Sequence, residues 1–182
     1  LIIYSLRSTI LNKTFALGNI SIFFTIFSFF VFINAFNMFD GINLQSSSYA
    51  LILILILCIR TGYHTGDIVL LISILAFMYL NFLNKCFLGD NGSLMLAFLI
   101  SYILVLNYNA HYIIRADEIF LMLMIPVLDL LRLLILRTYN KTGFYTPDRE
   151  HLHHYISNKY NDFYAFIIIF VLIWAPVLFG KI

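Results

Sequence analysis

Six long apolar runs, separated by short polar segments, limit the fold of this chain more than any other feature. They cover residues 15–36, 47–60, 67–83, 93–108, 117–137 and 162–180. A helix that crosses a bilayer needs about 20 apolar residues, with a range of about 17–25. The runs are continuous, whereas a transmembrane barrel would show polar residues at alternate positions. Because backbone groups in lipid must be paired within their own segment, each run predicts a helix.

Composition leads to the same fold. Of the 182 residues, 62% are hydrophobic and 11% are charged, whereas soluble domains are about half apolar and a quarter charged. A soluble core of this size cannot hide the excess, which must therefore face lipid. We predict an all-α, multi-pass transmembrane bundle, a single domain over residues 1–182, with residues 1–11 as the tail of an earlier helix. Because the chain begins with Leu1 and shows no signal peptide, we expect it to continue upstream.

Charge and cysteine content argue against several classes of protein. A formal net charge of +2 without a basic stripe does not favour nucleic acid as a partner. Cys58 and Cys86 lie in or beside apolar runs at no metal-ligand spacing, so we expect two buried thiols rather than a disulfide framework.

Six crossings sort the connections onto two faces of the membrane. The segments rich in Asp, Asn, Gly and His all fall on one face, and they are residues 37–46, 84–92 and 138–161. The connections 61–66 and 109–116 fall on the other face, where His64 and His111 are expected to be ordinary interfacial residues. Lys and Arg within residues 132–159 favour a cytoplasmic location for the first face.

The first polar cluster is INAFNMFDGIN, in which Asn34, Asn37 and Asp40 recur every three residues. On a helix they share one face, and Asp40-Gly41 is typical of a helix end at which glycine supplies the permissive backbone. The cluster is either a site, because polar groups at membrane depth are costly, or a set of caps and interhelical hydrogen bonds.

The second cluster is FLGDNGS, in which Asp90 stands between Gly89 and Gly92 before a helix expected to begin near Ser93. A helix N-terminus favours phosphate, and Mg²⁺ takes one or two carboxylates together with substrate phosphates. The structural alternative is that Asp90 or Ser93 only caps the helix. In a third segment, PVLDLLRLLILR, Asp129 and Arg132 could form a same-helix ion pair of either structural or functional meaning.

The segment YTPDREHLHHYI carries three of the five histidines. His151, His153 and His154 could bind Zn²⁺, although no further zinc ligand can be identified. With Arg149 they could instead donate hydrogen bonds to a diphosphate. A solvated basic loop is the structural alternative.

Three segments, in the same order, resemble the signatures of polyprenyl-phosphate N-acetylhexosamine-1-phosphate transferases. NAFNMFDGIN is similar to the family's Asn-Ala-x-Asn-x-x-Asp-Gly-x-Asp-Gly pattern, and FLGDNGS to its Phe-(Leu/Met)-Gly-Asp-x-Gly-Ser block. IPVLDLLRLLILR and TPDREHLHH resemble its Pro-x-x-Asp-x-x-Arg helix and Pro-Asp-Arg-x-His-Leu-His-His loop. Each block alone is moderately specific, whereas the ordered set is strong.

The resemblance implies a magnesium-dependent enzyme of the bacterial cytoplasmic membrane whose motif loops face the cytoplasm. It would move a sugar-1-phosphate from a UDP-N-acetylhexosamine to undecaprenyl phosphate, release UMP and initiate O-antigen or another cell-envelope polysaccharide. Mn²⁺ is an alternative metal, the branch that uses UDP-MurNAc-pentapeptide is an alternative donor class, and a homodimer is an alternative assembly.

The resemblance also implies roles for single residues. Asp90 would be the Mg²⁺ ligand, and Phe87 would pack on the uracil. The catalytic candidates are Asp40, Asp90, His151, His153 and His154. The substrate-binding candidates are Asn34, Asn37, Gly41, Asn43, Lys85, Phe87, Asp129, Arg132 and Arg149.

Two departures from the family pattern bear on activity. The family has an Asp-Asp pair before the first block, whereas the first acidic residue here is Asp40; we expect the pair upstream of Leu1. Asn43 stands where the family has its second Asp and removes one negative charge. A relative that binds ligand without turnover is therefore an alternative. A transporter is disfavoured, because the polar residues gather on one face.

Overall fold

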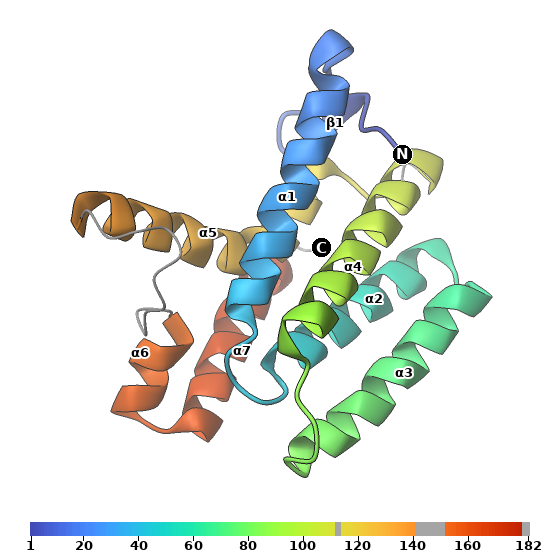
Figure 1. Ribbon diagram of the computed structural model, residues 1–182. Coiled ribbons are helices and arrows are strands. Elements are labelled where there is room, and N and C mark those ends of the chain that lie inside the picture. Colours follow the sequence, from blue (N-terminus) through green and yellow to red (C-terminus); the bar gives the residue numbers. More distant parts are fainter. Residues whose placement is uncertain (112–113, 141–151, 180–182) are drawn as a thin grey trace.

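The computed structural model describes residues 1–111, 114–140 and 152–179, with the backbone alone at 111, 140, 152–154 and 176–179. The described chain begins with a two-stranded hairpin and a short 3-10 turn and is otherwise helical (Figure 1). The elements are β1 (Ser5–Ser8), β2 (Lys13–Ala16), η1 (Gly18–Ile20), α1 (Ser21–Phe39), α2 (Gln45–Thr61), α3 (Thr65–Phe82), α4 (Gly89–His111), α5 (Ala116–Asn140), α6 (Leu152–Lys159) and α7 (Asp162–Phe179).

The prediction of an all-α membrane protein is confirmed. Within the described residues, four helices are long and apolar enough to cross a membrane: Gly18–Phe39, Thr65–Phe82, Gly89–Ala110 and Ala116–Tyr139. The apolar helices Gln45–Thr61 and Asp162–Ala175 coincide with two further predicted runs but are shorter. The chain is thus a multi-pass membrane protein.

The predicted helix tail at residues 1–11 is wrong, because the chain forms a β-hairpin there. β1 and β2 pair in antiparallel fashion, with Ser5 opposite Ala16 and Ser8 opposite Lys13. The hairpin turn is held by Asp117, which lies distant in the sequence and accepts hydrogen bonds from the N–H groups of Thr9 (2.7 Å) and Ile10 (3.0 Å). A long-range contact of this kind leaves no local signal in the sequence.

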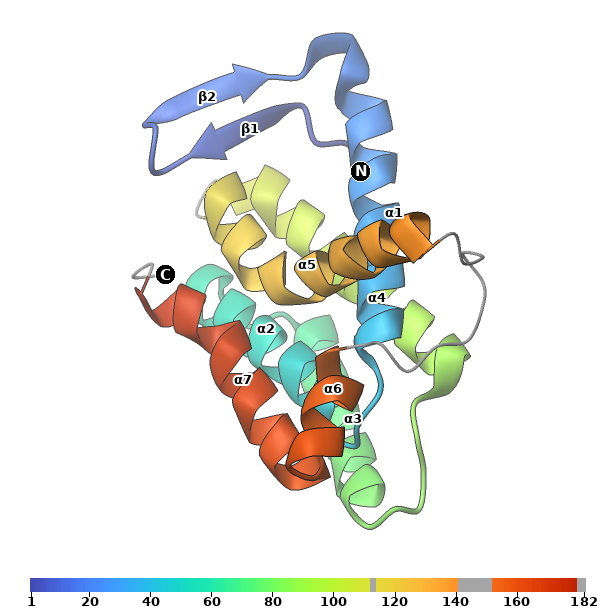
Figure 2. The same cartoon turned by 90° about the vertical axis from the view of Figure 1, so that its left-hand side faces the viewer.

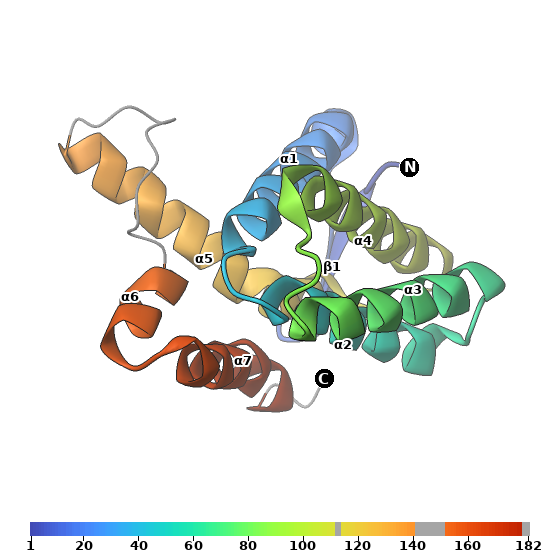
Figure 3. The ribbon, with the colours of Figure 1, turned by 60° about the horizontal axis from the view of Figure 1, so that its bottom comes forward.

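The core lies where α1, α2, α4 and α5 meet, as α1 packs on α4 and α5, and α2 on α4. Phe36, Leu53, Ile100 and Met122 are fully buried there, one from each of these helices. The buried Tyr49 hydroxyl donates to the Met122 carbonyl oxygen (2.8 Å), which links α2 to α5. α5 crosses α1 at a steep angle, as Figure 3 shows.

The outer helix α3 packs on α2 and exposes a broad apolar face. This face consists of Ile68, Val69, Ile72, Leu75 and Tyr79, all of which are exposed. An outward apolar face is what a lipid-facing helix requires, so the pattern agrees with a membrane location.

Two ends of the bundle differ in character. The hairpin covers one end, at the top of Figure 2. The α1–α2 and α3–α4 loops lie together at the opposite end. The end of α1, the start of α2, the end of α3 and the start of α4 therefore meet there, and two of the three motif blocks with them.

Candidate functional site

A polar pocket of about 180 Å³ lies at the end of the bundle opposite the hairpin. Residues from both of the loops that meet there line it, so segments far apart in the sequence share one space. The lining consists of Asn37, Asp40, Gly41, Ile42, Asn43, Leu44, Ser47, Phe77, Asn81, Phe87, Leu88, Gly89 and Asp90.

Six of the predicted site residues come together in this pocket. From the first motif they are Asn37, Asp40, Gly41 and Asn43, and from the second they are Phe87 and Asp90. The Phe87 side chain is 84% exposed, so its ring is available for stacking on a flat ligand. The structure thus joins the first two motif blocks in one pocket.

Asp90 lies close enough to Asp40 for its charge to affect the ionisation of Asp40. Burial raises the pKa of Asp40 above its ordinary value of 3.8, the Ser46 hydroxyl acts in the opposite direction, and the negative charge of Asp90 raises it further. Two carboxylates that repel each other in one pocket fit a divalent cation, which would remove the repulsion. Within the described part of the chain, no three His, Cys, Asp or Glu side chains are grouped as a metal cluster, so such a cation would need further ligands from substrate or water.

The two motif helices are also joined directly. The Ser93 hydroxyl donates to the Oδ1 atom of Asn37 and lies near the carbonyl oxygen of Asp90. Ser93 is completely buried, so this contact holds the end of α1 against the first turn of α4. Sequence reasoning assigned Ser93 only a capping role.

The backbone of the two loops differs from the prediction in detail. α1 ends at Phe39, as expected for an Asp-Gly helix end. The positive φ angles of the α1–α2 and α3–α4 connections, however, are not at Gly41 but at Leu44 (69°), Asn84 (54°) and Gly89 (64°). α4 begins at Gly89 rather than near Ser93, so Asp90 lies in the first turn of the helix. Leu44 is a bulky residue in a left-handed conformation, which costs energy and is typical of functional loops.

Four predicted substrate-binding residues lie outside the lining of this pocket. Asn34 donates to the Phe30 carbonyl oxygen of its own helix (2.7 Å), and Lys85 is exposed on the α3–α4 loop. Asp129 and Arg132 form an ion pair one turn apart in α5 (2.9 Å). The ion pair was predicted as one of two alternatives, and the substrate roles of all four residues stay predictions.

The histidine segment falls largely outside the described residues. Arg149 and His151 lie beyond them, and the backbone alone is described for His153 and His154, which stand in the first turn of α6. Their predicted roles at the site therefore stay predictions.

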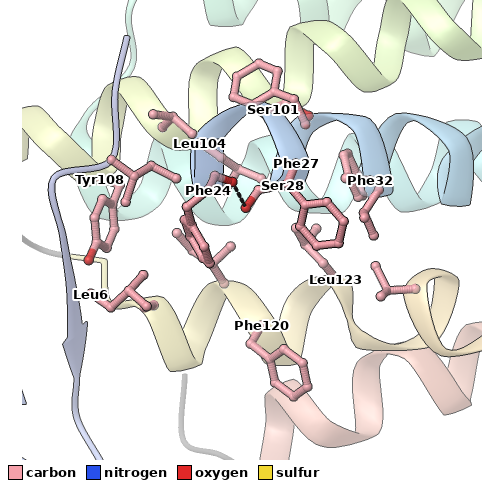
Figure 4. A pocket seen from close by; sticks show the side chains of 17 residues that line it. Leu6, Phe24, Phe27, Ser28, Phe32, Ser101, Leu104, Tyr108, Phe120 and Leu123 are labelled. Carbon is pink, nitrogen blue, oxygen red and sulfur yellow. Dashed lines mark hydrogen bonds between the residues drawn. The ribbon is translucent and has the colours of Figure 1, made fainter. Parts of the chain in front are cut away.

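A second cavity, of about 440 Å³, lies among α1, α4, α5 and β1 toward the hairpin (Figure 4). Phe24, Phe27, Phe120 and Leu123 are among its lining residues. Its serine hydroxyls are bonded within their own helices, as Ser28 is to the Phe24 carbonyl oxygen (2.8 Å). This cavity could hold hydrocarbon but offers little to a phosphate or a metal ion, so the polar pocket is the candidate site.

Sequence reasoning missed Asn81, Ser47 and Phe77 as pocket residues. Asn81 and Phe77 lie within an apolar run that was interpreted only as a membrane span. One signal was present, since an amide near the end of such a run is costly unless it is bonded. Ser47 gave no signal, because its place depends on how the start of α2 meets α3.

Comparison with known proteins agrees with this geometry. Residues 1–108 match the family described as glycosyl transferase family 4. The chain is 30% identical over 167 residues to an undecaprenyl-phosphate alpha-N-acetylglucosaminyl 1-phosphate transferase of Escherichia coli, covering 84% of this chain and 45% of that relative. A relative of the same name in Yersinia pestis is 29% identical, over 84% of this chain and 46% of the relative.

A more distant match comes from Bacillus subtilis. A probable undecaprenyl-phosphate N-acetylglucosaminyl 1-phosphate transferase of that organism is 28% identical, over 79% of this chain and 42% of the relative. The chain spans about half the length of the curated relatives it matches. None of the solved structures matches it. Because the family match covers more than half of the residues and includes both motif blocks of the pocket, the chain belongs to glycosyl transferase family 4.

Proposed function

We propose that this chain forms the donor-binding part of an enzyme that transfers N-acetylhexosamine-1-phosphate from a UDP-sugar to undecaprenyl phosphate. A lipid phosphate oxygen forms a bond to the β-phosphorus of the donor. The phosphoanhydride bond between the α and β positions breaks, and UMP leaves with its oxygen. The convergence of Asp40, Asp90 and the exposed Phe87 in one pocket at the membrane boundary carries this proposal.

Five of the pocket residues have a role in the proposed reaction. Phe87 stacks on the uracil, and Asn37 with Asn43 lines the nucleotide. Asp40 and Asp90 would hold Mg²⁺, which would offset the charge of the two anionic substrates. The apolar helices keep the polyprenyl chain in lipid while its phosphate reaches the same surface.

The location of the site supports a cytoplasmic orientation. UDP-sugars are cytosolic, so the proposal places the pocket on the cytoplasmic side of the bacterial inner membrane and the hairpin on the other side. An initiating step in cell-envelope polysaccharide synthesis, O-antigen included, is the role we propose for the product.

The test is UMP release from UDP-N-acetylglucosamine by the full-length protein with undecaprenyl phosphate and Mg²⁺. We expect Asp90→Asn to lower the rate about 100-fold, because several kcal/mol of charge stabilisation depend on the bound metal. Asp67→Asn, which changes an acidic residue at the start of α3, is the matched control and should keep the rate. A wild-type protein that binds the donor but releases no UMP would favour the relative without turnover.

The histidine segment is tested separately. We propose that His153 and His154 hold the diphosphate of the donor, because lipid-facing helices lack hydrogen-bond donors for it. Replacing both with Ala should raise the KM for the UDP-sugar at least about tenfold, because the loss of even one charge-assisted hydrogen bond has an effect of that size. Unaltered kinetics would remove this segment from the site.

A further inference from the structure

One buried amide side chain connects the two loops of the pocket. Asn81 lies in the last turn of α3 and is 4% exposed. Its Oδ1 atom accepts a hydrogen bond from the Leu44 N–H (2.7 Å), and its Nδ2 atom donates to the Cys86 carbonyl oxygen (2.8 Å) and to the Asn43 Oδ1 atom (3.3 Å). Asn81 thus bonds the α1–α2 loop and the α3–α4 loop at once.

These loops carry the groups that the proposed reaction needs. Asp40 and Asn43 belong to the first loop, while Phe87 directly follows Cys86 in the second. Both Nδ2 hydrogens of Asn81 are used within the protein, and an amide nitrogen has only two. Asn81 therefore has no free N–H to donate to a ligand, and its hydrogen bonds act on the two loops.

The bond to Leu44 has a specific energetic role. Leu44 is held at φ 69°, a left-handed conformation that is strained for a residue with a bulky side chain and persists only where neighbouring groups enforce it. The Asn81 oxygen meets the N–H of this strained residue. Without that acceptor, the turn that presents Asp40 and Asn43 would relax.

A second amide bond supports the same arrangement at the surface. The Nδ2 atom of Asn43 donates to the Oδ1 atom of Asn84, a residue at φ 54°. Asn tolerates this left-handed conformation better than most residues do. Asn84 is exposed, and it is not one of the described residues that line the pocket. Its contribution is therefore to the conformation of the loop.

We propose that Asn81 is a positioning residue for the donor: it fastens the strained Leu44 turn to the Phe87 loop and so pre-assembles the nucleotide pocket. This inference rests on the proposed function. It concerns the donor alone, so the lipid acceptor should be unaffected.

The experiment compares the full-length wild type with Asn81→Leu, which keeps the volume of the side chain and removes its hydrogen bonds. The KM for UDP-N-acetylglucosamine should rise about tenfold, because the N–H of the strained Leu44 loses its acceptor, while the KM for undecaprenyl phosphate should change less than about twofold. Adding Leu44→Gly relieves the backbone strain at this position. The donor KM of the double variant should therefore be about threefold lower than that of Asn81→Leu.

Asn107→Leu is the matched control. Asn107 is another buried asparagine, bonded to the Ile103 carbonyl oxygen of its own helix (2.9 Å). It lies about 20 Å along α4 from Ser93, so its replacement should leave the donor KM unchanged. If Asn81→Leu does not fold, the exposed Asn84→Ala carries the test and should raise the donor KM about threefold.

The outcomes separate the two proposals. An unchanged donor KM in Asn81→Leu, or a double variant in which the two effects simply add without recovery, would overturn the role of Asn81 and leave the proposed function standing. If the wild type itself fails to use UDP-N-acetylglucosamine, the proposed function falls, and this inference falls with it.

Discussion

At the scale of single residues, the site depends on a pair of carboxylates that the fold places together at an energetic cost. Burial and the charge of Asp90 both raise the pKa of Asp40. A chain selected for stability alone would avoid placing the charge of Asp90 beside the partly buried Asp40, because like charges repel. The proposed divalent cation would offset this repulsion.

Replacing Asp40 with Asn should stabilise the apo protein at neutral pH. Because the folded-state pKa lies above 3.8, the folded chain binds the proton more tightly than the unfolded chain does. The stability that this group contributes is complete below the ordinary pKa and is lost as the pH rises through the folded-state pKa. The measurement is thermal unfolding in detergent from pH 4 to 8. At pH 7 the variant should unfold at a higher temperature than the wild type, and this difference in unfolding temperature should disappear as the pH falls toward about 4.

The effect of Mg²⁺ on the unfolding temperature is a second measurement on the same two proteins. Mg²⁺ bound between Asp40 and Asp90 should raise the unfolding temperature of the wild type and leave that of Asp40→Asn nearly unchanged. A larger loss of stability in the variant at pH 7 than at pH 4 would contradict the raised pKa. An equal response of both proteins to Mg²⁺ would contradict the metal site.

At the scale of elements, short departures from regular structure decide how the helices present the site. Gly89, at φ 64°, is the first residue of α4, and its backbone conformation sets the orientation of the first turn, which carries Asp90. Leu44 does the equivalent for α2 without the freedom of a glycine. The hairpin is a third case, since Asp117 at the start of α5 holds its turn.

Gly89→Ala should reduce the free energy of unfolding by about 1–2 kcal/mol, the cost of a left-handed residue with a Cβ. Among the described residues, a Cβ at this position would meet Phe87 Cδ2 alone, at 4.0 Å, so the loss reflects backbone strain rather than a clash. The rate of UMP release should fall as well, because Asp90 is displaced.

Gly92→Ala is the matched control for this prediction, three residues further along the same helix. Its Cβ would meet the flexible side chain of Leu88 at 3.1 Å, and alanine favours a helix interior. Its effect should therefore be smaller than that of Gly89→Ala. If the two variants lost the same amount of stability in thermal unfolding, packing and not the positive φ angle would explain the requirement for glycine at position 89.

At the scale of the whole molecule, the bundle separates the end that carries the candidate site from the end that carries the hairpin. The polar pocket lies at one end, and the hairpin with its contacts to Asp117 and Tyr108 lies at the other. Helices long enough to span a bilayer join the two ends. This separation is what a reaction between a lipid phosphate and a cytosolic donor requires.

Accessibility labelling in intact cells tests the arrangement. In a background without Cys58 and Cys86, cysteines introduced at Asn84, Tyr155 and Ile10, all exposed, would be treated with a membrane-impermeant thiol reagent. Ile10→Cys should react from outside the inner membrane, while the other two should react only after the cells are opened. If the cysteines at 84 and 155 react from opposite sides, the histidine segment and the pocket cannot form one site.

The amino-acid sequence by itself determined the membrane helices, the end of α1 just before Asp40, and the grouping of Asp40, Asn43, Phe87 and Asp90 as candidate site residues. These follow from local properties, namely the length of apolar runs, helix-end chemistry and motif order. Only the tertiary structure decided that Asn81 binds both loops, that Leu44 adopts a left-handed turn and that residues 5–16 form a hairpin held by Asp117. Each of these depends on hydrogen bonds between residues far apart in the chain, and such bonds exist only once the helices have packed.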